Sequence, residues 1–200
     1  MKTLCMDSSH KHLVIVLIED QNIIAYAEEQ CWKKQSEKLF PTLISLMDSC
    51  NWTADDLDRI VITDGPGSYT GVRIAMTVAK VLASQKKIPL YCISSLQLLA
   101  GVKQKAFALT DARSNRAYCA FYEYGRLVKD EMILNLEEIQ DLLSTYDGCI
   151  VGDASLLGKE DSYDHLAKNF IDLLSFANEV DNVHTLTPRY LKEQEAYKLV

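Results

Sequence analysis

A glycine-rich segment is the part of the sequence whose residue types most suggest a chemically active loop. Residues 64–80 read DGPGSYTGVRIAMTVAK and directly follow the apolar run RIVIT at 59–63. Glycine-rich loops between a strand and a helix often bind phosphate through their backbone N–H groups. A Walker loop requires Lys and then Ser or Thr after its last glycine, whereas Val72 and Arg73 follow Gly71 here. The residue types therefore argue against a Walker-type phosphate site.

The glycine spacing favours a structural loop. The segment reads G-x-G-x-x-x-G, which differs from the dinucleotide fingerprint G-x-G-x-x-G. Gly65 and Gly67, on either side of Pro66, allow the backbone to turn with a positive φ. Ser68 or Thr70 can cap the helix that follows. We interpret these five residues as a turn and cap that begin a helix.

A second candidate site is the turn after Asp7, where MDSSHKH spans residues 6–12. Some ATP-dependent kinases place an Asp at the end of a first strand to help hold a hydrated metal ion, and the following turn receives phosphate. Those enzymes usually show D-x-G-T, whereas Ser9 stands at the glycine position here. Asp7, Ser8 and Ser9 are therefore only weak candidates for cofactor binding, and a polar turn between strands is the favoured interpretation.

The remaining histidines and cysteines do not form a recognisable metal or redox motif. His10 and His12 would project to one face of a strand, but the sequence shows no third ligand. His165 and His184 are isolated and predicted to lie on the surface. The six cysteines form no C-x-x-C pair and are interpreted as small buried side chains in a reducing compartment. We predict no metal ion and no cofactor.

Composition limits the classes of function. The chain has 200 residues, 48% of them hydrophobic, and a formal net charge of −7. An acidic chain is a poor stand-alone nucleic-acid binder, because neutralising phosphates drives such binding. The longest apolar run, LVIVLI, is far shorter than a membrane span, and the first residues show no signal-peptide pattern. We expect a cytoplasmic protein with no membrane contact.

The elements that would position these residues follow from apolar periodicity. Strands are predicted at 3–7, 13–20, 23–29, 59–63, 88–93, 107–111, 117–124, 127–133 and 149–153. Helices are predicted at 36–50, from the glycine-rich loop to about 85, and at 96–102, 136–146 and 161–170. Pro41 is expected in a first turn or at a kink, Thr53 as an N-cap, and Ser94 with Gln97 as a capping box.

An internal repeat suggests the fold class. Aligned without a gap, residues 6–24 match 110–128, with Asp7 against Asp111 and Glu19 against Glu123. Two copies of meander, helix, strand and helix fit an α/β protein of the actin-like, sugar-kinase-like ATPase fold, built from duplicated ribonuclease-H-like lobes. We predict an N-terminal lobe at 1–102 that docks a partner and a smaller C-terminal lobe at 103–200. Because the motifs of the working enzymes are missing, we expect a non-catalytic member.

The helix after the loop has two apolar faces when projected at about 100° per residue. Its polar stripe contains Arg73, Thr77, Lys80 and Ser84. Its large apolar residues, expected to face the sheet, are Ile74, Val78, Val81 and Leu82. A ridge of small residues, flanked by Val72 and Met76, contains Gly71, Ala75, Ala79 and Ala83. Such a ridge allows another helix to approach closely, so we favour a docking face, with complete burial inside this chain as the alternative.

The sequence resembles the TsaB (YeaZ) family over nearly its whole length. Residues 64–83 are very similar to the family signature G-P-G-S-[FY]-T-G-[LV]-R-I-G, with Ala75 in the last place. Further matches are MDSS for I-D-T-S, SEKLFPTLISLM for H-S-E-x-L-L-P, ALTDARSNRAYCAFY for D-A-R-x-x-x-V-Y, and TPRYLK for Y-L-R. Gln35 replaces the His that commonly precedes S-E in this family.

The resemblance implies a non-catalytic subunit of the bacterial system that adds threonylcarbamoyl to N6 of adenosine 37 in ANN-decoding tRNAs. It implies pairing with the catalytic paralogue TsaD, association with the ATPase TsaE, a homodimer through the same surface, and contact with tRNA only through partners. A nucleotide could sit at the boundary with partner subunits. The expected interface residues are Phe40, Leu43, Ile44, Met47, Gly71, Val72, Arg73, Ala75, Met76, Ala79, Lys80 and Ala83. On this view, Ala75→Glu or Ala79→Arg abolishes pairing and leaves the fold intact.

Two enzymatic hypotheses remain as alternatives. A small ATP-dependent phosphotransferase would use Asp7, Asp111 and the glycine-rich loop, and it predicts tight Mg-ATP binding by the isolated chain. A metalloprotease is the weaker alternative, because no helix of the sequence carries paired histidines.

Overall fold

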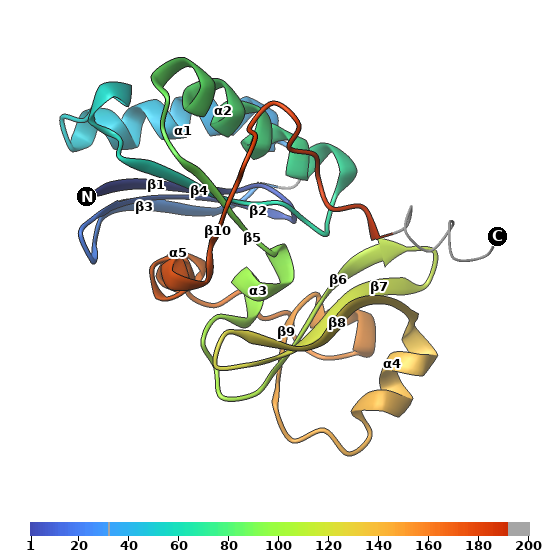
Figure 1. Ribbon diagram of the computed structural model, residues 1–200. Coiled ribbons are helices and arrows are strands. Elements are labelled where there is room, and N and C mark those ends of the chain that lie inside the picture. The colour runs from blue at the N-terminus through green and yellow to red at the C-terminus, as the bar shows by residue number, and fades with distance from the viewer. Residues whose placement is uncertain (32, 192–200) are drawn as a thin grey trace.

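The computed structural model describes residues 1–31 and 33–191 and divides them between two sheets (Figure 1). The larger sheet has the strand order β10-β5-β4-β1-β2-β3, and the smaller has the order β8-β7-β6-β9. In both, an antiparallel meander is followed by a parallel strand, which is the arrangement of a ribonuclease-H-like lobe. The predicted α/β fold of two such lobes is confirmed.

The N-terminal lobe is built around β1, which lies in the middle of the larger sheet. Its strands are β1 (Lys2–Asp7), β2 (His12–Glu19), β3 (Asn22–Gln30), β4 (Arg59–Thr63), β5 (Leu90–Ile93) and β10 (Asn178–Glu179). Strand β1 pairs antiparallel with β2 and parallel with β4. Both faces of β2 are buried, which explains why its sequence is an unbroken apolar run.

Helices cover both faces of this sheet. On one face lie α1 (Gln35–Ser49) and α2 (Tyr69–Lys86), side by side above the strands (Figure 1). On the other face lie α3 (Ser95–Ala100) and α5 (Leu166–Asp172). Alternate residues of β2 serve the two cores: Leu13, Ile15 and Leu17 pack toward α1 and α2, whereas Val14, Val16 and Ile18 pack toward α3 and α5.

The C-terminal lobe contains the four-stranded sheet and one covering helix. Its elements are β6 (Ala106–Arg113), β7 (Arg116–Glu123), β8 (Arg126–Asn135), α4 (Leu136–Leu143) and β9 (Cys149–Gly152). The second strand of the repeat has the same bounds in both lobes, because His12–Glu19 of β2 corresponds without a gap to Arg116–Glu123 of β7. Its pairing with the preceding strand differs by one residue, since Asp7 lies opposite Val14 whereas Asp111 lies opposite Ala117.

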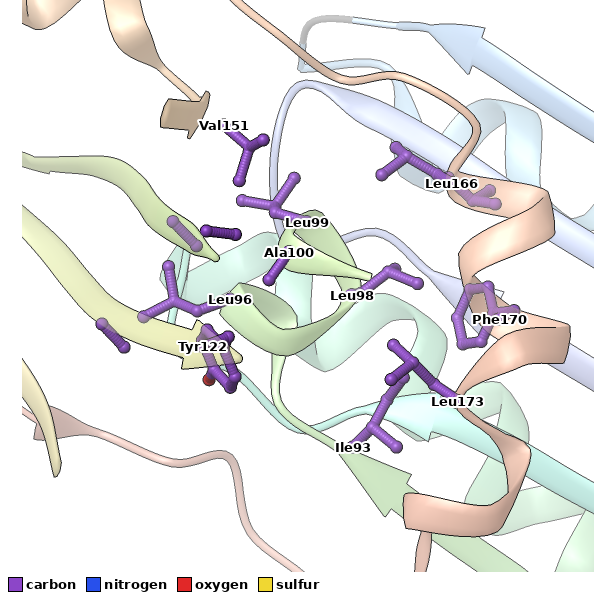
Figure 2. Packing of buried hydrophobic residues seen from close by; sticks show 14 of the residues in the cluster. Ile93, Leu96, Leu98, Leu99, Ala100, Tyr122, Val151, Leu166, Phe170 and Leu173 are labelled. Atoms are coloured by element: carbon purple, nitrogen blue, oxygen red, sulfur yellow. The ribbon is translucent and has the colours of Figure 1, made fainter. Parts of the chain in front are cut away.

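One apolar cluster joins the two lobes (Figure 2). The short helix α3 lies at its centre, with Leu96 and Leu99 near Tyr122 and Val151 of the smaller sheet. Leu98 points toward Phe170 of α5 (Figure 2). On the sheet side, β6 presents Ala106 and Ala108, whose small side chains leave room for α3. The lobes therefore share a core.

The C-terminal segment returns to the N-terminal lobe, which corrects the predicted boundary of a lobe at 103–200. Strand β10 pairs with β5, and Val180, Val183 and Leu186 pack against the core beneath α1 and α2. Helix α5 also packs on β2 and β3. By their contacts, residues 166–191 thus belong with the N-terminal lobe. Residues 192–200, the last part of the predicted C-terminal lobe, lie outside the described part of the chain.

Several local expectations also differ from the structure. Helix α5 begins at Leu166 and not at 161, because Ser162 forms a bridge with Gly152. Pro41 lies in the interior of α1. The Gln97 side chain bonds the carbonyl of Gly125 and does not complete a capping box with Ser94. Within residues 1–31 and 33–191, no helix combines the length and apolarity needed to cross a membrane.

The cysteines are unpaired, as the sequence suggested, but they are not all buried. None of the six forms a disulfide, and Cys5, Cys31, Cys92 and Cys119 are core residues. Cys50 is half-buried and Cys149 is exposed.

Candidate functional site

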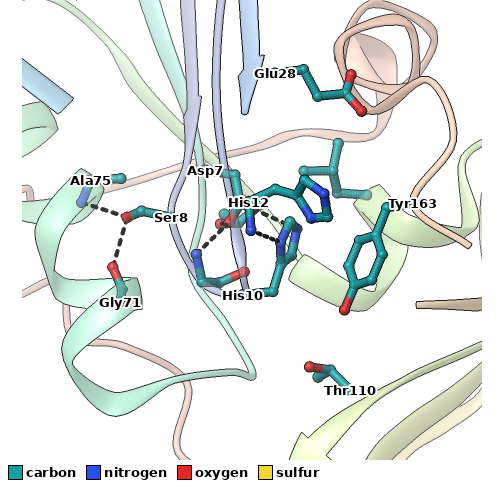
Figure 3. Close-up of polar contacts among 12 residues, drawn as sticks. Asp7, Ser8, His10, His12, Glu28, Gly71, Ala75, Thr110 and Tyr163 are labelled. Carbon is teal, nitrogen blue, oxygen red and sulfur yellow. Dashed lines mark hydrogen bonds and ion pairs between the residues drawn. The ribbon is translucent and has the colours of Figure 1, made fainter. Parts of the chain in front are cut away.

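Asp7 ends β1 in a fully buried position (Figure 3). One of its carboxylate oxygens accepts hydrogen bonds from the Ser9 N–H, at 3.0 Å, and from the Thr63 hydroxyl. The other oxygen lies 2.8 Å from His10 Nε2. Burial alone would raise the pKa of Asp7, but His10, Thr63 and Ser9 outweigh it and hold this pKa below its usual value. Both oxygens of the carboxylate therefore contact groups of the protein itself, and the carboxylate does not fit the role of a ligand for a hydrated metal ion.

His10 uses both nitrogens of its ring. Nε2 faces Asp7, and Nδ1 accepts the backbone N–H of His12 at 3.2 Å. Its carbonyl accepts a hydrogen bond from the Gln35 side chain at 2.8 Å. A histidine whose two nitrogens are both engaged cannot take a proton from a substrate without breaking one of these bonds. Gln35 therefore has a structural role, because it ties the start of α1 to the turn between β1 and β2.

His12 is expected to make stability depend on pH. Burial, followed by the charges of His10 and Lys11, lowers the pKa of His12 to about 4, although Asp7 and Asp153 act in the opposite direction. The unfolded chain accepts this proton near its ordinary pKa of 6.5. The stabilising contribution of neutral His12 is thus complete above about pH 6.5 and is lost as the pH falls toward about 4.

This expectation can be measured by urea unfolding at pH about 7 and about 5. The wild type should lose more stability than His12→Gln over this interval, because glutamine does not titrate. His184→Gln, at an exposed position, should keep the wild-type loss and serves as the control. Equal losses for the wild type and His12→Gln would contradict the prediction.

The glycine-rich loop packs on the turn that follows Asp7. Ser68 caps α2 by accepting the Gly71 N–H, and its own N–H donates to the Ser9 carbonyl at 2.8 Å. A Cβ at Gly67 would lie 2.5 Å from the Ser9 carbonyl oxygen, and a Cβ at Gly71 would lie 2.4 Å from that of Ser8. These two glycines are thus required for close backbone contact. Thr70, the other proposed cap, is an exposed residue of the first turn.

Ser8 is also occupied by this contact (Figure 3). Its hydroxyl donates to the Gly71 carbonyl at 2.7 Å and accepts the Ala75 N–H at 3.1 Å. The loop therefore joins the first turn of α2 to the end of β1.

A polar cluster links the two lobes beside His10. Lys11 Nζ lies 2.9 Å from Asp153 and 2.5 Å from Asp161, and the Tyr163 hydroxyl donates to Asp153 at 2.6 Å. Burial lowers the pKa of Lys11, but the two carboxylates outweigh it, and the net shift of this pKa is upward. The Tyr163 ring also lies against His12, with ring centroids 4.5 Å apart.

Asp111, the repeat partner of Asp7, does not join it in a catalytic pair. Asp111 is exposed, and its carboxylate accepts the Arg113 N–H at 2.6 Å. Among the residues that the structure describes, no three His, Cys, Asp or Glu side chains converge as a metal site would require.

Arg189 forms a junction that the sequence did not reveal. Its guanidinium lies 2.9 Å from Asp64, at the start of the glycine-rich segment, and 3.1 Å from Glu131 on β8. The Arg189 N–H also donates to the Asp64 carbonyl at 2.7 Å. These partners are 125 and 58 positions away from Arg189. Only tertiary structure brings them together, and no local pattern could have found them.

The predicted orientation of α2 is wrong for its small residues, although Val78 packs in the core of its own lobe as expected. The small residues expected to face a partner, Ala75, Ala79 and Ala83, are almost fully buried against the sheet of their own lobe. The other expected interface residues Leu43, Gly71, Val72 and Met76 are buried as well. By contrast, Val81 is 57% exposed although it was expected to face the sheet. Small residues let the helix lie close to large strand side chains, and this contact is internal.

Helical geometry instead directs large apolar side chains toward the seam between α1 and α2. Lys38 of α1 pairs with Glu29 on the edge strand β3, and Lys80 of α2 donates to the Leu186 carbonyl of the C-terminal segment. These contacts mark the outer sides of the two helices. At about 100° per residue, the apolar residues that lie away from them face the seam. They form the seam patch: Phe40, Ile44, Ile74 and Val81.

The seam patch is well exposed for an apolar surface. Phe40 and Ile44 are each 56% exposed, and Ile74 is half-buried. Of the other predicted interface residues, Arg73 is exposed, whereas Met47 and Lys80 are half-buried. Exposed apolar residues that gather on one face of a folded domain commonly mark a protein interface.

Comparison with known proteins gives consistent matches. The family model of TsaD, tRNA N6-adenosine threonylcarbamoyltransferase, matches residues 28–200. The tRNA threonylcarbamoyladenosine biosynthesis protein TsaB of Bacillus subtilis is 32% identical, covering 98% of this chain and 96% of that protein. TsaB of Escherichia coli is 27% identical over 62% of this chain and 55% of its own length. The structure of YeaZ from Pseudomonas aeruginosa has a TM-score of 0.77 and 22% identity, covering 95% of this chain and 99% of that one.

Proposed function

Because the chain belongs to the TsaB (YeaZ) family, we propose that it is a non-catalytic subunit in the biosynthesis of tRNA threonylcarbamoyladenosine. The relatives that match over most of their length carry that biosynthetic role in their names. In this proposal the chain supplies a binding surface, and a catalytic paralogue of the TsaD type transfers threonylcarbamoyl to N6 of adenosine 37 in ANN-decoding tRNAs.

The environment of Asp7 supports a role without chemistry. The carboxylate that would hold a metal ion is buried and paired with His10. The glycine-rich loop uses the Ser68 N–H and the Gly71 N–H for contacts inside the lobe. We therefore propose that the chain needs no metal ion or cofactor of its own, with a nucleotide possible only at a boundary with partner subunits.

The seam patch is the observation that carries the proposed partner contact. It joins two helices of the N-terminal lobe, and burying its exposed Phe40, Ile44 and Val81 would remove apolar area from water. We propose that TsaD binds here, that a homodimer uses the same surface when TsaD is absent, and that TsaE joins the assembly. Contact with tRNA would come through these partners, in the cytoplasm.

An arginine within the seam patch should abolish this pairing. Ile44→Arg places a charge in an interface that would be desolvated, and a cost of about 3 kcal/mol would weaken binding more than a hundredfold. The measurement is co-purification with TsaD, followed by titration of the purified chains.

The chain offers a matched control for this experiment. Val128→Arg, on β8 of the other lobe, replaces an apolar residue with the same 56% exposure and should leave pairing unchanged. Wild-type pairing by Ile44→Arg, with its fold retained, would show that the seam patch is not the interface. Formation of the modified adenosine by TsaD with and without the wild-type chain tests the function as a whole.

A further inference from the structure

The segment 178–191, which we call the C-terminal strap, contacts both lobes. It begins at β10, which pairs with β5 at the edge of the larger sheet. In Figure 1 the strap, coloured red, runs beside α2 and then toward the smaller sheet. Lys80 of α2 donates to the strap carbonyls of His184 and Leu186, at 3.1 and 2.8 Å. These contacts attach the strap to the N-terminal lobe.

Near the end of the strap, Arg189 joins one carboxylate from each lobe. Asp64, directly after β4, belongs to the N-terminal lobe, and Glu131 on β8 belongs to the C-terminal lobe. The two ion pairs measure 2.9 and 3.1 Å. The Asp64 side chain is 15% exposed and the Glu131 side chain 5% exposed, so salt screens these pairs much less than surface pairs.

The Glu131 carboxylate is itself held in place from both lobes. Its other oxygen accepts hydrogen bonds from the Tyr122 hydroxyl, at 3.0 Å, and from the Ser94 hydroxyl. Tyr122 lies on β7 of the C-terminal lobe, whereas Ser94 caps α3 at the end of β5. The guanidinium is a planar fork with fixed donor directions. Arg189 can therefore contact both carboxylates only when the lobes stand at a matching angle.

The apolar cluster around α3 joins the lobes but does not by itself fix their angle. Apolar contacts are non-directional, and packed elements can slide past one another by small amounts. A rotation of one lobe would keep most of this core but would separate Asp64 from Glu131. Arg189 would then lose one partner, and a largely buried carboxylate would lose its counter-charge. The ion pairs thus oppose a motion that the apolar core permits.

A second charged contact between the lobes lies at the same edge of the larger sheet. Lys11, in the turn after β1, pairs with Asp153 and Asp161 of the C-terminal lobe. Strands β1 and β4 are neighbours in the sheet, and both Lys11 and Asp64 follow the ends of these strands. This contact and the α3 core would keep the lobes joined if the pairs of Arg189 were broken.

We propose that Arg189 is a clasp that holds the two lobes at one fixed angle. The strap that carries Arg189 is also bound to α2, so the clasp fixes the smaller sheet relative to this helix. Without the clasp, the lobes stay joined through α3 and Lys11 but rotate against each other. This conformational device goes beyond the proposed function, because it requires no partner protein.

The test is the distribution of distances between two spin labels, one on each lobe, measured by pulsed electron paramagnetic resonance on the full-length chain. One label is attached at Gln21→Cys, in the exposed turn between β2 and β3, and the other at the exposed Cys149. Cys50→Ser removes the half-buried thiol, and an excess of unlabelled chain removes distances between copies. The wild-type clasp should give one narrow distance, and Arg189→Met should replace it with a broad distribution.

A second variant breaks the clasp from the other lobe. Glu131→Gln removes the carboxylate charge on β8, leaves the strap unchanged, and should broaden the distribution as well. The matched control is Arg59→Met, which removes an arginine of β4 whose contacts with Thr3 and Tyr91 stay within the N-terminal lobe. This control should keep the narrow distance. Circular dichroism of each labelled chain establishes that it is folded.

Each outcome decides the proposal. Loss of the narrow distance in folded Arg189→Met and Glu131→Gln chains supports the clasp. A narrow distance retained by either folded variant overturns it, as does a broad distribution with the wild-type clasp or equal broadening by Arg59→Met. If Arg189→Met does not fold, Glu131→Gln decides alone. Pairing with TsaD is absent from this assay, so its failure leaves the proposed function separately testable.

Discussion

Ala79→Arg is expected to destroy the fold of the N-terminal lobe. Ala79 is fully buried beneath α2 in the core that this helix shares with β1 and β4. An arginine there must either bury an unpaired guanidinium or push the helix off the sheet. Either cost should exceed about 4 kcal/mol, which is a large part of a domain's stability of about 5–15 kcal/mol. This reverses the sequence-based expectation that the variant would keep its fold and lose only a partner.

The measurement for Ala79→Arg is urea unfolding followed by circular dichroism. Thr77→Arg is the matched control, because Thr77 is exposed on the same helix, and it should unfold like the wild type. A cooperative transition of Ala79→Arg at the wild-type midpoint would show that α2 faces the other way.

His10→Ala is expected to produce the second large loss of stability. Without the imidazole, the Asp7 carboxylate stays fully buried and keeps only its bonds to Thr63 and Ser9. Leaving a buried charged group without one of its hydrogen-bond partners typically costs about 1–3 kcal/mol or more. The expected result is a clearly lower urea midpoint with an unchanged m-value.

A double variant separates this explanation from a simple packing defect. Asp7→Asn removes the buried charge that the contact with His10 stabilises, so the double variant with Asp7→Asn and His10→Ala should be more stable than His10→Ala alone. If the second substitution gave no recovery, the loss would come from the cavity left by the imidazole and not from the unpaired carboxylate.

Local patterns were reliable wherever neighbours in sequence decide the structure. The gapless repeat placed the strands around Asp7 and Asp111 correctly, but their pairing registers differ by one residue, because Asp7 pairs with Val14 and Asp111 pairs with Ala117. The cap of α2 was narrowed by sequence to Ser68 or Thr70, and the structure places it at Ser68. Hydrogen bonds between residues two or three positions apart in the sequence are enough to form such turns and caps.

The orientation of α2 could not be obtained in the same way. Helical periodicity separates a polar stripe from apolar faces, but it does not say which apolar face meets the sheet of the same lobe. Here the strands supply large side chains, such as Leu4, Ile60 and Ile62, and the helix supplies the small ones. Because large strand side chains fill most of the space between sheet and helix, only small helix residues fit there. The small ridge of Ala75, Ala79 and Ala83 therefore faces the sheet, and Val81 faces away from it.

The same distinction between local and tertiary features applies to the candidate site. The sequence alone determined the duplicated α/β fold, the cap and turn of the glycine-rich loop, and the resemblance to the TsaB family. Only the tertiary structure decided that Asp7 is paired with His10, that Arg189 joins Asp64 to Glu131, and that Phe40, Ile44 and Val81 are exposed on α1 and α2. The reason is physical: burial and charge pairing depend on side chains brought together from distant parts of the chain, whereas periodicity and turn chemistry act between near neighbours.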